Sequence, residues 1–122
     1  MIIRELLTRF QAAKPNAYSQ ETLVSWISDL DGQISQSVHQ GRAGMPTLSK
    51  AYSVDTDLNT VLLVPFPFEQ IYLFWLSAMV DNQNEEYDRY ANEMQLFNSY
   101  KNSYAASVAQ SHADLNSGWI TV

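Results

Sequence analysis

Residues on which many functions depend are absent or scarce in this chain. Among its 122 residues there is no cysteine, and there are only two histidines and seven basic residues. The lack of cysteine excludes disulfides, thiolate zinc sites and cysteine nucleophiles, so packing alone must hold the fold. The basic residues are scattered, which disfavours wrapping of DNA or RNA, because a nucleic-acid face must neutralise phosphates. At this length we expect one domain with one core.

Long hydrophobic runs are also lacking. The most apolar block is PFPFEQIYLFWLSAMVD at 65–81, and its uninterrupted part, 71–80, measures only about 15 Å as a helix. A bilayer core is roughly 30 Å thick, so this block is too short to span a membrane. At the start of the chain, Arg4, Glu5 and Arg9 interrupt the apolar segment that a signal peptide needs. We therefore expect neither membrane insertion nor secretion.

The surface charge is low and mostly of one sign. The formal net charge is −6, yet charged residues make up only 16% of the chain, against about a quarter in typical proteins. A weakly charged surface gives little long-range repulsion between copies, which suits self-association.

Apolar residues at helical spacing predict four helices, two of them in the first 40 residues. The first covers 2–10 and ends before Lys14 and Pro15. Ser19 provides an N-cap for the second, which spans 20–40. The apolar stripe of this second helix comprises Leu23, Trp26, Ile27, Leu30, Ile34 and Val38. Gly32 inside it predicts either a bend or the close approach of another backbone.

The other two helices include and follow the apolar block. The third begins at about Pro67, a residue that suits the first turn of a helix. Since 71–80 is apolar on all sides, we expect it to be the central helix. The fourth runs from Glu85 to about Gln110, and its stripe has the spacing of a helix seam. That stripe comprises Tyr87, Tyr90, Met94, Phe97, Lys101, Tyr104 and Val108. Its aromatic residues fit a core or a ligand cavity, and the helical spacing favours the core.

The remaining segments lack a helical period. Residues 41–59 predict a long central loop or a weak hairpin, and TVLLV at 60–64 predicts a short strand paired with 51–54. Residues 113–122 form a polar C-terminal tail that acts as a docking arm or folds back as a strand. The predicted fold is therefore mainly α: a single domain over 1–112, built as a bundle of about four helices with a long central loop and a minor strand or hairpin.

The chain offers few groups for catalysis. His39 lies at the end of the second predicted helix and His112 lies just past the last one, where the negative end of the helix dipole favours a charged imidazole as a cap. We expect Asp29 and Asp31 on the exposed face of the second helix, and the acidic residues of 81–88 at a solvated corner instead of a calcium loop. No zinc-protease, nucleophile-elbow or phosphate-loop motif occurs. We therefore expect no enzyme activity, no metal site and no cofactor.

Three segments form an ordered packing pattern. They are YSQETLVSWISDLDGQI at 18–34, LLVPFPFEQIYLFWLSAMVD at 62–81 and NEEYDRYANEMQLFNSYKNSYA at 84–105. The marks of the pattern are Trp26, Leu30 to Gly32, Pro65, Tyr72, Asp81, Glu86, Arg89, Tyr90, Phe97 and Asn98. In this order the segments resemble the small α-helical head-tail connector (adaptor) proteins of tailed bacteriophages and prophages. The resemblance covers about 18–112, and none of its positions is catalytic.

The resemblance implies a structural virion protein of the neck, or head-tail junction, made in the cytoplasm of the host bacterium. Copies assemble as a homo-oligomeric ring, with a dodecamer as one option, between the portal protein and a neighbouring tail or stopper protein, and DNA passes transiently through it. The expected contact elements are the loop and the tail. The candidate contact residues are Arg42, Met45, Tyr52, Tyr100, Trp119, Ile120 and Val122. The alternative is a small helical regulator, of phage or bacterial origin, that binds one partner protein.

Overall fold

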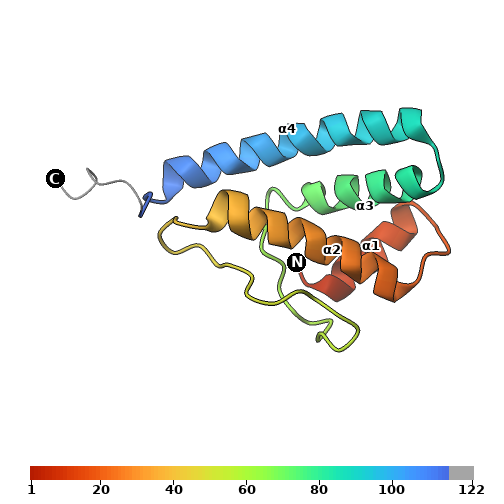
Figure 1. The fold of residues 1–122 in the computed structure, drawn as a ribbon, viewed down its shortest axis with the longest axis horizontal. Coiled ribbons are helices and arrows are strands. Elements are labelled where there is room, and N and C mark those ends of the chain that lie inside the picture. The colour runs from red at the N-terminus through yellow and green to blue at the C-terminus, as the bar shows by residue number, and fades with distance from the viewer. Residues whose placement is uncertain (116–122) are drawn as a thin grey trace.

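The computed structural model describes residues 1–115, and these residues form a mainly α-helical unit, as predicted (Figure 1). The helices are α1 (Ile3–Ala13), α2 (Gln20–Ile34), α3 (Gln70–Gln83) and α4 (Tyr87–Ser111), and a π-helical turn, η1 (Ser35–His39), continues α2. In Figure 1, α4 and α3 run antiparallel as neighbours, and α2 lies below them. The loop between α2 and α3 lies below α2. Within residues 1–115 no helix is both long enough and apolar enough to cross a bilayer.

The ends of the first two helices follow the local chemistry of the sequence. The Ser19 hydroxyl accepts a hydrogen bond from the Thr22 N–H at 3.1 Å, which confirms the predicted N-cap. α1 ends at Ala13, shortly before Pro15, and the Lys14 N–H still bonds to the Phe10 carbonyl. The expected close approach of a backbone at Gly32 is wrong, because no heavy atom from another part of the chain lies within 4 Å of the place where its Cβ would be.

The start of α3 differs from the prediction by three residues. The helix begins at Gln70, whereas Pro67 lies in a turn in which the Phe68 N–H bonds to the Pro65 carbonyl at 2.9 Å. The Phe66–Pro67 peptide bond is cis. Proline at this place therefore belongs to the turn that leads into the helix.

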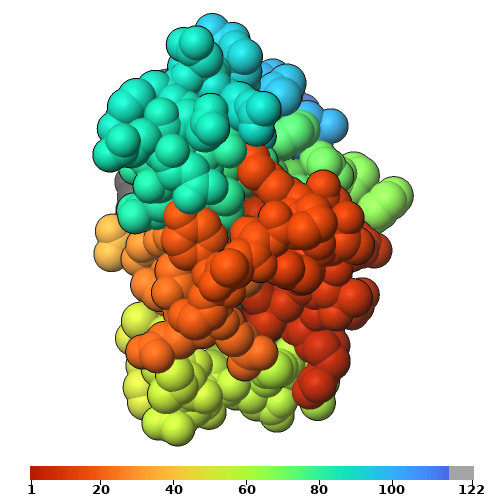
Figure 2. Space-filling view, turned by 90° about the vertical axis from the view of Figure 1, so that its right-hand side faces the viewer, coloured from red at the N-terminus to blue at the C-terminus, as the bar shows by residue number. Residues whose placement is uncertain are grey.

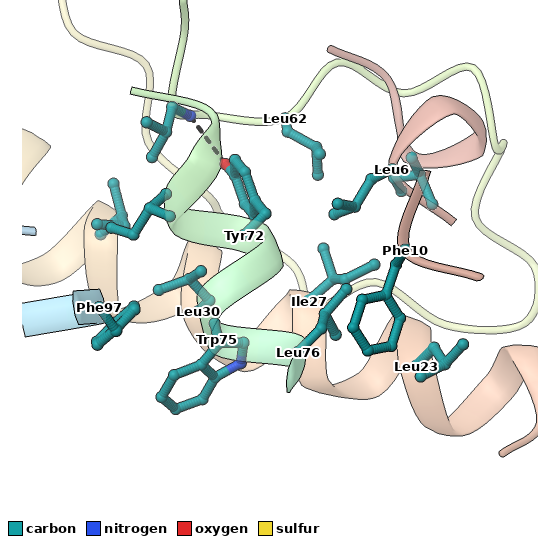
Figure 3. Close-up of a cluster of buried hydrophobic side chains, with 14 of the residues drawn as sticks. Leu6, Phe10, Leu23, Ile27, Leu30, Leu62, Tyr72, Trp75, Leu76 and Phe97 are labelled. Carbon is teal, nitrogen blue, oxygen red and sulfur yellow. Dashed lines mark hydrogen bonds between the residues drawn. The ribbon is translucent and has the colours of Figure 1, made fainter. Parts of the chain in front are cut away.

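α3 is the central helix, as its apolar composition predicts. It contacts α1, α2 and α4, and Ile71, Tyr72 and Leu76 are fully buried. Figure 3 shows Tyr72, Trp75 and Leu76 between Phe97 on one side and Phe10, Leu23 and Ile27 on the other. Burial of each large apolar side chain contributes roughly 1.5–3 kcal/mol, so this contact surface is a substantial part of the driving force for folding.

The predicted pairing of 60–64 with 51–54 is wrong. Residues 60–64 form no strand, and their backbone lies against the start of the chain: the Ile3 N–H bonds to the Thr60 carbonyl at 3.1 Å, and the Leu62 N–H bonds to the Met1 carbonyl at 2.9 Å. A single antiparallel bridge joins Ile2 to Val61. The segment is rich in β-branched residues, but among residues 1–115 its pairing is limited to this one bridge.

The predicted seam of α4 is partly correct. Phe97, Tyr104 and Val108 are buried, whereas Tyr87 at the start of the helix is exposed. The N-terminal end of α4 therefore extends beyond the core. Figure 2 shows this end of the molecule, where the α3–α4 corner (teal) lies above the connection between α1 and α2 (orange).

Candidate functional site

Three of the contact residues predicted in the loop and on α4 lie at or near the surface. Met45 is half-buried and lines an apolar groove described below. Tyr100 is partly exposed, and its ring packs against Phe74 with the ring centroids 5.2 Å apart. Arg42 is half-buried: its backbone bridges to Asp114, and its guanidinium donates a hydrogen bond to the His112 carbonyl at 3.4 Å.

The other predicted contact residues fall elsewhere. Tyr52 is buried, so its hydroxyl serves the interior of the fold and is not offered to a partner in this conformation. Trp119, Ile120 and Val122 lie outside the described residues. The start of the predicted tail is within them: the Ala43 N–H bonds to the Ala113 carbonyl, and the Leu115 N–H bonds to the Gly41 carbonyl.

The inner face of α2 and η1 carries a polar stripe, which consists of Ser28, Asp31, Ser35 and His39. All four residues are buried, so the expected exposed position of Asp31 is wrong. Each side chain binds the loop of residues 40–69. The Ser28 hydroxyl accepts from the Tyr52 N–H at 2.9 Å, and the Ser35 hydroxyl accepts from the Leu48 N–H at 2.8 Å. The stripe therefore satisfies backbone groups of a loop that has no regular structure of its own.

Asp31 is the centre of this stripe. Its Oδ2 accepts from the Tyr52 hydroxyl at 2.6 Å and from the Leu63 N–H at 3.2 Å, and its Oδ1 accepts from the Tyr72 hydroxyl at 2.5 Å. The Tyr72 hydroxyl in turn accepts from the Val64 N–H, the dashed line in Figure 3. Since every neighbour donates, the carboxylate needs no proton to satisfy its bonds.

The electrostatics of this group follow from its burial. Burial raises the pKa of Asp31, and the hydrogen bonds from Tyr52, Tyr72 and Leu63 oppose that increase. Burial and the nearby Asp31 carboxylate raise the pKa of Tyr72 well above its usual value, and the pKa of Tyr52 rises for the same reasons. Both phenols therefore stay protonated and act as donors.

His39 does not act as the predicted charged helix cap. Its Nδ1 donates to the Pro46 carbonyl at 2.6 Å, and its Nε2 accepts from the Tyr104 hydroxyl. Burial lowers the pKa of His39, against the opposing influence of the Pro46 carbonyl and of Asp31. Burial raises the pKa of Tyr104 to about 12, so that phenol is a donor too. A neutral imidazole thus joins the loop to α4.

His112, at the C-cap of α4, also bonds to another segment of the chain. Its Nδ1 lies 2.8 Å from the Ala43 carbonyl, and the side chain is half-buried. It therefore connects the end of α4 to the start of the loop.

A second polar cluster, the Lys14 cluster, ties α1 to α3 and α4. The Lys14 ammonium donates to the Ser77 hydroxyl at 2.8 Å, to Asp81 at 2.6 Å and to Glu93 at 3.3 Å. Asp81 is buried, so its expected place at a solvated corner is wrong. Burial raises the pKa of Asp81, but the hydrogen bond and ion pair with the Lys14 ammonium outweigh it and leave the pKa lowered. Burial, together with the Asp81 carboxylate, raises the pKa of Glu93, whose buried Oε2 has no hydrogen-bond partner within residues 1–115.

The polar cluster around Asp31 does not have the organisation of a catalytic centre. The polar atoms around Asp31 are engaged with one another or with the loop backbone, which leaves no nucleophile beside a free base. No group of three or more histidine, cysteine or acidic side chains that would hold a metal ion is found among residues 1–115. What these clusters do is fix the loop and the ends of the helices in place.

One surface hollow with a mostly apolar lining is a candidate binding site. A groove of about 440 Å³ lies between the C-terminal half of α4 and the segments around Met45 and 61–68. The residues that shape it include Met45, Val61, Phe66, Phe68, Val108 and His112. Phe66 is 82% exposed and Val61 is 67% exposed. We call this hollow the apolar groove.

A line of exposed side chains leads along α4 toward the apolar groove. Leu96 is 47% exposed and Tyr100 is 36% exposed, and they lie one turn apart. Ser107 and Ser111, which line the apolar groove, follow on the same side of α4 at helical spacing. We call Leu96, Tyr100 and the rim residues Val61 and Phe66 the apolar strip.

We found no family model, no curated protein and no solved structure that matches the chain. The resemblance to head-tail connectors therefore stays a prediction from the sequence.

Helical spacing contains a signal for both buried aspartates. Asp31 is four residues after Ile27 and three before Ile34, which places it on the buried side of α2. Asp81 follows Ala78 by three residues on α3 in the same way. Residue type had placed them at the surface, although position on the helix places them inside.

Proposed function

We propose that this chain is a structural subunit, a head-tail connector (adaptor) of a tailed phage or prophage. In this role, copies assemble as a ring between the portal and the tail or stopper protein, and DNA passes through the ring. The proposal makes the protein a virion component of the neck, with no catalytic activity of its own.

The observation that carries the proposal is the uncovered apolar strip beside α4. In a unit of this size, several exposed aromatic and aliphatic side chains beside an apolar groove are a feature of protein-binding surfaces. Aromatic residues are enriched at such interfaces, because their large rings bury much area at low entropic cost. The surface fits contact with a neighbouring subunit better than it fits a substrate site.

The charge of the chain supports the passage of DNA without capture. The net charge is −6, and the seven basic residues are distributed along the sequence. Phosphates then meet no basic stripe that would release their counterions. A ring of such subunits lets DNA slide.

The test is assembly with a portal protein. The chain is mixed with the portal protein of the same phage or prophage, the mass of the mixture is measured by light scattering, and the particles are imaged by electron microscopy. A complex with a ring of chain density on the portal is the expected result. A chain that stays monomeric beside the portal at every ratio tried contradicts the proposal.

The same experiment separates the alternative role of a helical regulator. A regulator would use the apolar groove to hold one partner protein and would form a complex of small, fixed stoichiometry. A heterodimer with a cytoplasmic protein, together with no binding to the portal, would favour that role.

A further inference from the structure

We infer that the apolar groove of one subunit receives residues 119–122 of a second copy of this chain. The inference rests on the proposed function, since it names the contact by which neighbouring subunits join. It is argued from the shape and chemistry of the groove, from the sequence of the last residues, and from the direction in which the described chain ends.

The apolar groove is suited to an uncharged apolar segment. Its volume of about 440 Å³ is within the range of roughly 300–1,000 Å³ that pockets for compact ligands occupy. Aliphatic, aromatic and proline side chains make up most of its wall, and no aspartate, glutamate, lysine or arginine is among them. Ser107 and Ser111 provide hydroxyl groups on the α4 side.

The last seven residues of the chain, NSGWITV, have matching chemistry. None of their side chains is charged, and they contain Trp119, Ile120 and Val122. A tryptophan ring buries about 150–250 Å² when it is covered, and its indole N–H needs an acceptor. The hydroxyl of Ser107 or Ser111 can accept that bond within an otherwise apolar wall.

The end of the described chain indicates that the groove belongs to another copy. Ala113 pairs with Ala43, and Leu115 pairs with Gly41, so the chain moves from Ala43 toward Gly41 as it proceeds. The apolar groove instead begins on the other side of Ala43, at Met45. To fill its own groove the chain would have to reverse at once, whereas the remaining seven residues can extend about 23–25 Å outward to a neighbour.

A contact of this kind has a consequence for assembly. The segment and the groove are different surfaces of one chain, so each copy can give its segment to one neighbour and receive a segment from another. Such head-to-tail contacts form a ring when the rotation between copies closes. This is the geometry that the proposed function needs.

Cross-linking between two single-cysteine variants tests the inference, and the natural chain contributes no cysteine background. Val61→Cys places a thiol on the rim of the groove, and Ile120→Cys places one on the segment. The full-length variants, one of them carrying an affinity tag, are mixed and treated with a short bismaleimide. We expect a tagged–untagged dimer as the main product, formed at least five times faster than with the control pair.

The control pair is Ile120→Cys with Asn102→Cys, since Asn102 is exposed and lies on the side of α4 that faces away from the apolar groove. Equal yields from the two pairs would overturn the inference. The double variant Val61→Cys, Ile120→Cys is treated at low concentration as well. A cross-linked monomer, with no dimer from the mixed single variants, would show that the segment fills its own groove and would also overturn it.

The outcome is distinct from the test of the proposed function. Cross-linking reports whether two copies of the chain meet through segment and groove, and portal binding reports whether the assembly is a connector. Dimers without portal binding would contradict the connector role but support the contact between copies. Portal binding together with a cross-linking rate no higher than that of the control pair would contradict only the contact between segment and groove.

Discussion

The two sides of α2 contact two very different regions of the molecule. On one side, Leu23, Ile27 and Leu30 belong to the apolar core shared with α1 and α3. On the other side, the polar stripe of Ser28, Asp31, Ser35 and His39 holds a loop that contains no helix or strand. The helices satisfy their own backbone groups and need only apolar contact, whereas the loop depends on side chains for its backbone partners. The fixed loop in turn forms one wall of the apolar groove.

The largest effect is expected from removal of the carboxylate that anchors the loop. Asp31→Ala leaves the Tyr52 hydroxyl, the Tyr72 hydroxyl and the Leu63 N–H without their acceptor. Each buried donor that loses its partner costs about 1–3 kcal/mol, offset in part because a buried charge is also removed. We expect a loss of about 3–5 kcal/mol in the free energy of unfolding, measured by urea denaturation with circular dichroism.

The matched control is Asp29→Ala on the same helix. Asp29 is exposed, so its removal should change the free energy of unfolding by no more than about 0.5 kcal/mol. Limited proteolysis adds a local measurement: cleavage between residues 47 and 59 should be faster in Asp31→Ala than in the natural chain. Equal stabilities for the two variants would mean that the loop is held by something other than the polar stripe.

A smaller effect on stability is expected in the Lys14 cluster, where the Lys14 ammonium balances the charge of the buried Asp81. Lys14→Met leaves Asp81 buried without its ammonium, and we expect a loss of about 2 kcal/mol, because Lys14 keeps some contact with solvent. The lowered pKa of Asp81 sets the sign of the pH effect. Its contribution is present above the unfolded pKa of about 3.8 and is lost as the pH falls through the folded pKa.

Urea denaturation at pH 7 and pH 3 measures this difference between Lys14→Met and the natural chain. The difference should shrink in acid. Lys50→Met is the control, since Lys50 is exposed on the loop and forms none of the described ion pairs. A loss as large from Lys50→Met would argue against a specific role for the Lys14 cluster.

The regular half of the fold could be predicted from the sequence, for a physical reason. Helical periodicity, the Ser19 cap and the apolar block are all local features, and they located the helices and the central place of α3 to within a few residues. The loop could not be predicted in the same way. Its backbone partners are single side chains of α2 and the first residues of the chain, and no repeating pattern in the loop itself encodes them.

The contact residues were harder to predict than the helices. Tyrosine is a common residue type at interfaces, but the Tyr52 hydroxyl donates a hydrogen bond to Asp31 in the interior. Phe66 and Val61 line the apolar groove, but neither was predicted as a contact residue, since their exposure depends on how the loop packs against α4. A tyrosine or a phenylalanine alone does not reveal which of these two places it occupies.

An effect of about 1 kcal/mol is expected from the neutral histidine of the polar stripe. His39→Gln removes a residue whose folded pKa is lowered, so the natural chain, but not the variant, loses stability as the pH falls below about 6.5 and the unfolded state gains a proton. The natural chain should be the more stable at pH 7.5, and its advantage should decrease by about 1 kcal/mol at pH 5. Urea denaturation at both values measures it, and an advantage that does not change with pH would contradict a neutral His39.

The smallest effect on stability should come from substitutions in the apolar strip, because its side chains are exposed, whereas those of the polar stripe are buried against the loop. Leu96→Ser removes an exposed side chain, so the free energy of unfolding should change by no more than about 0.5 kcal/mol. Its effect should fall on association: the mass by light scattering in the presence of the portal protein should shift toward free monomer. Asn102→Ser, on the opposite side of α4, should change neither quantity. A side chain that contacts only a partner contributes nothing to the stability of the free chain. If Leu96→Ser lowered stability and left association intact, the apolar strip would therefore belong to the fold and not to an interface.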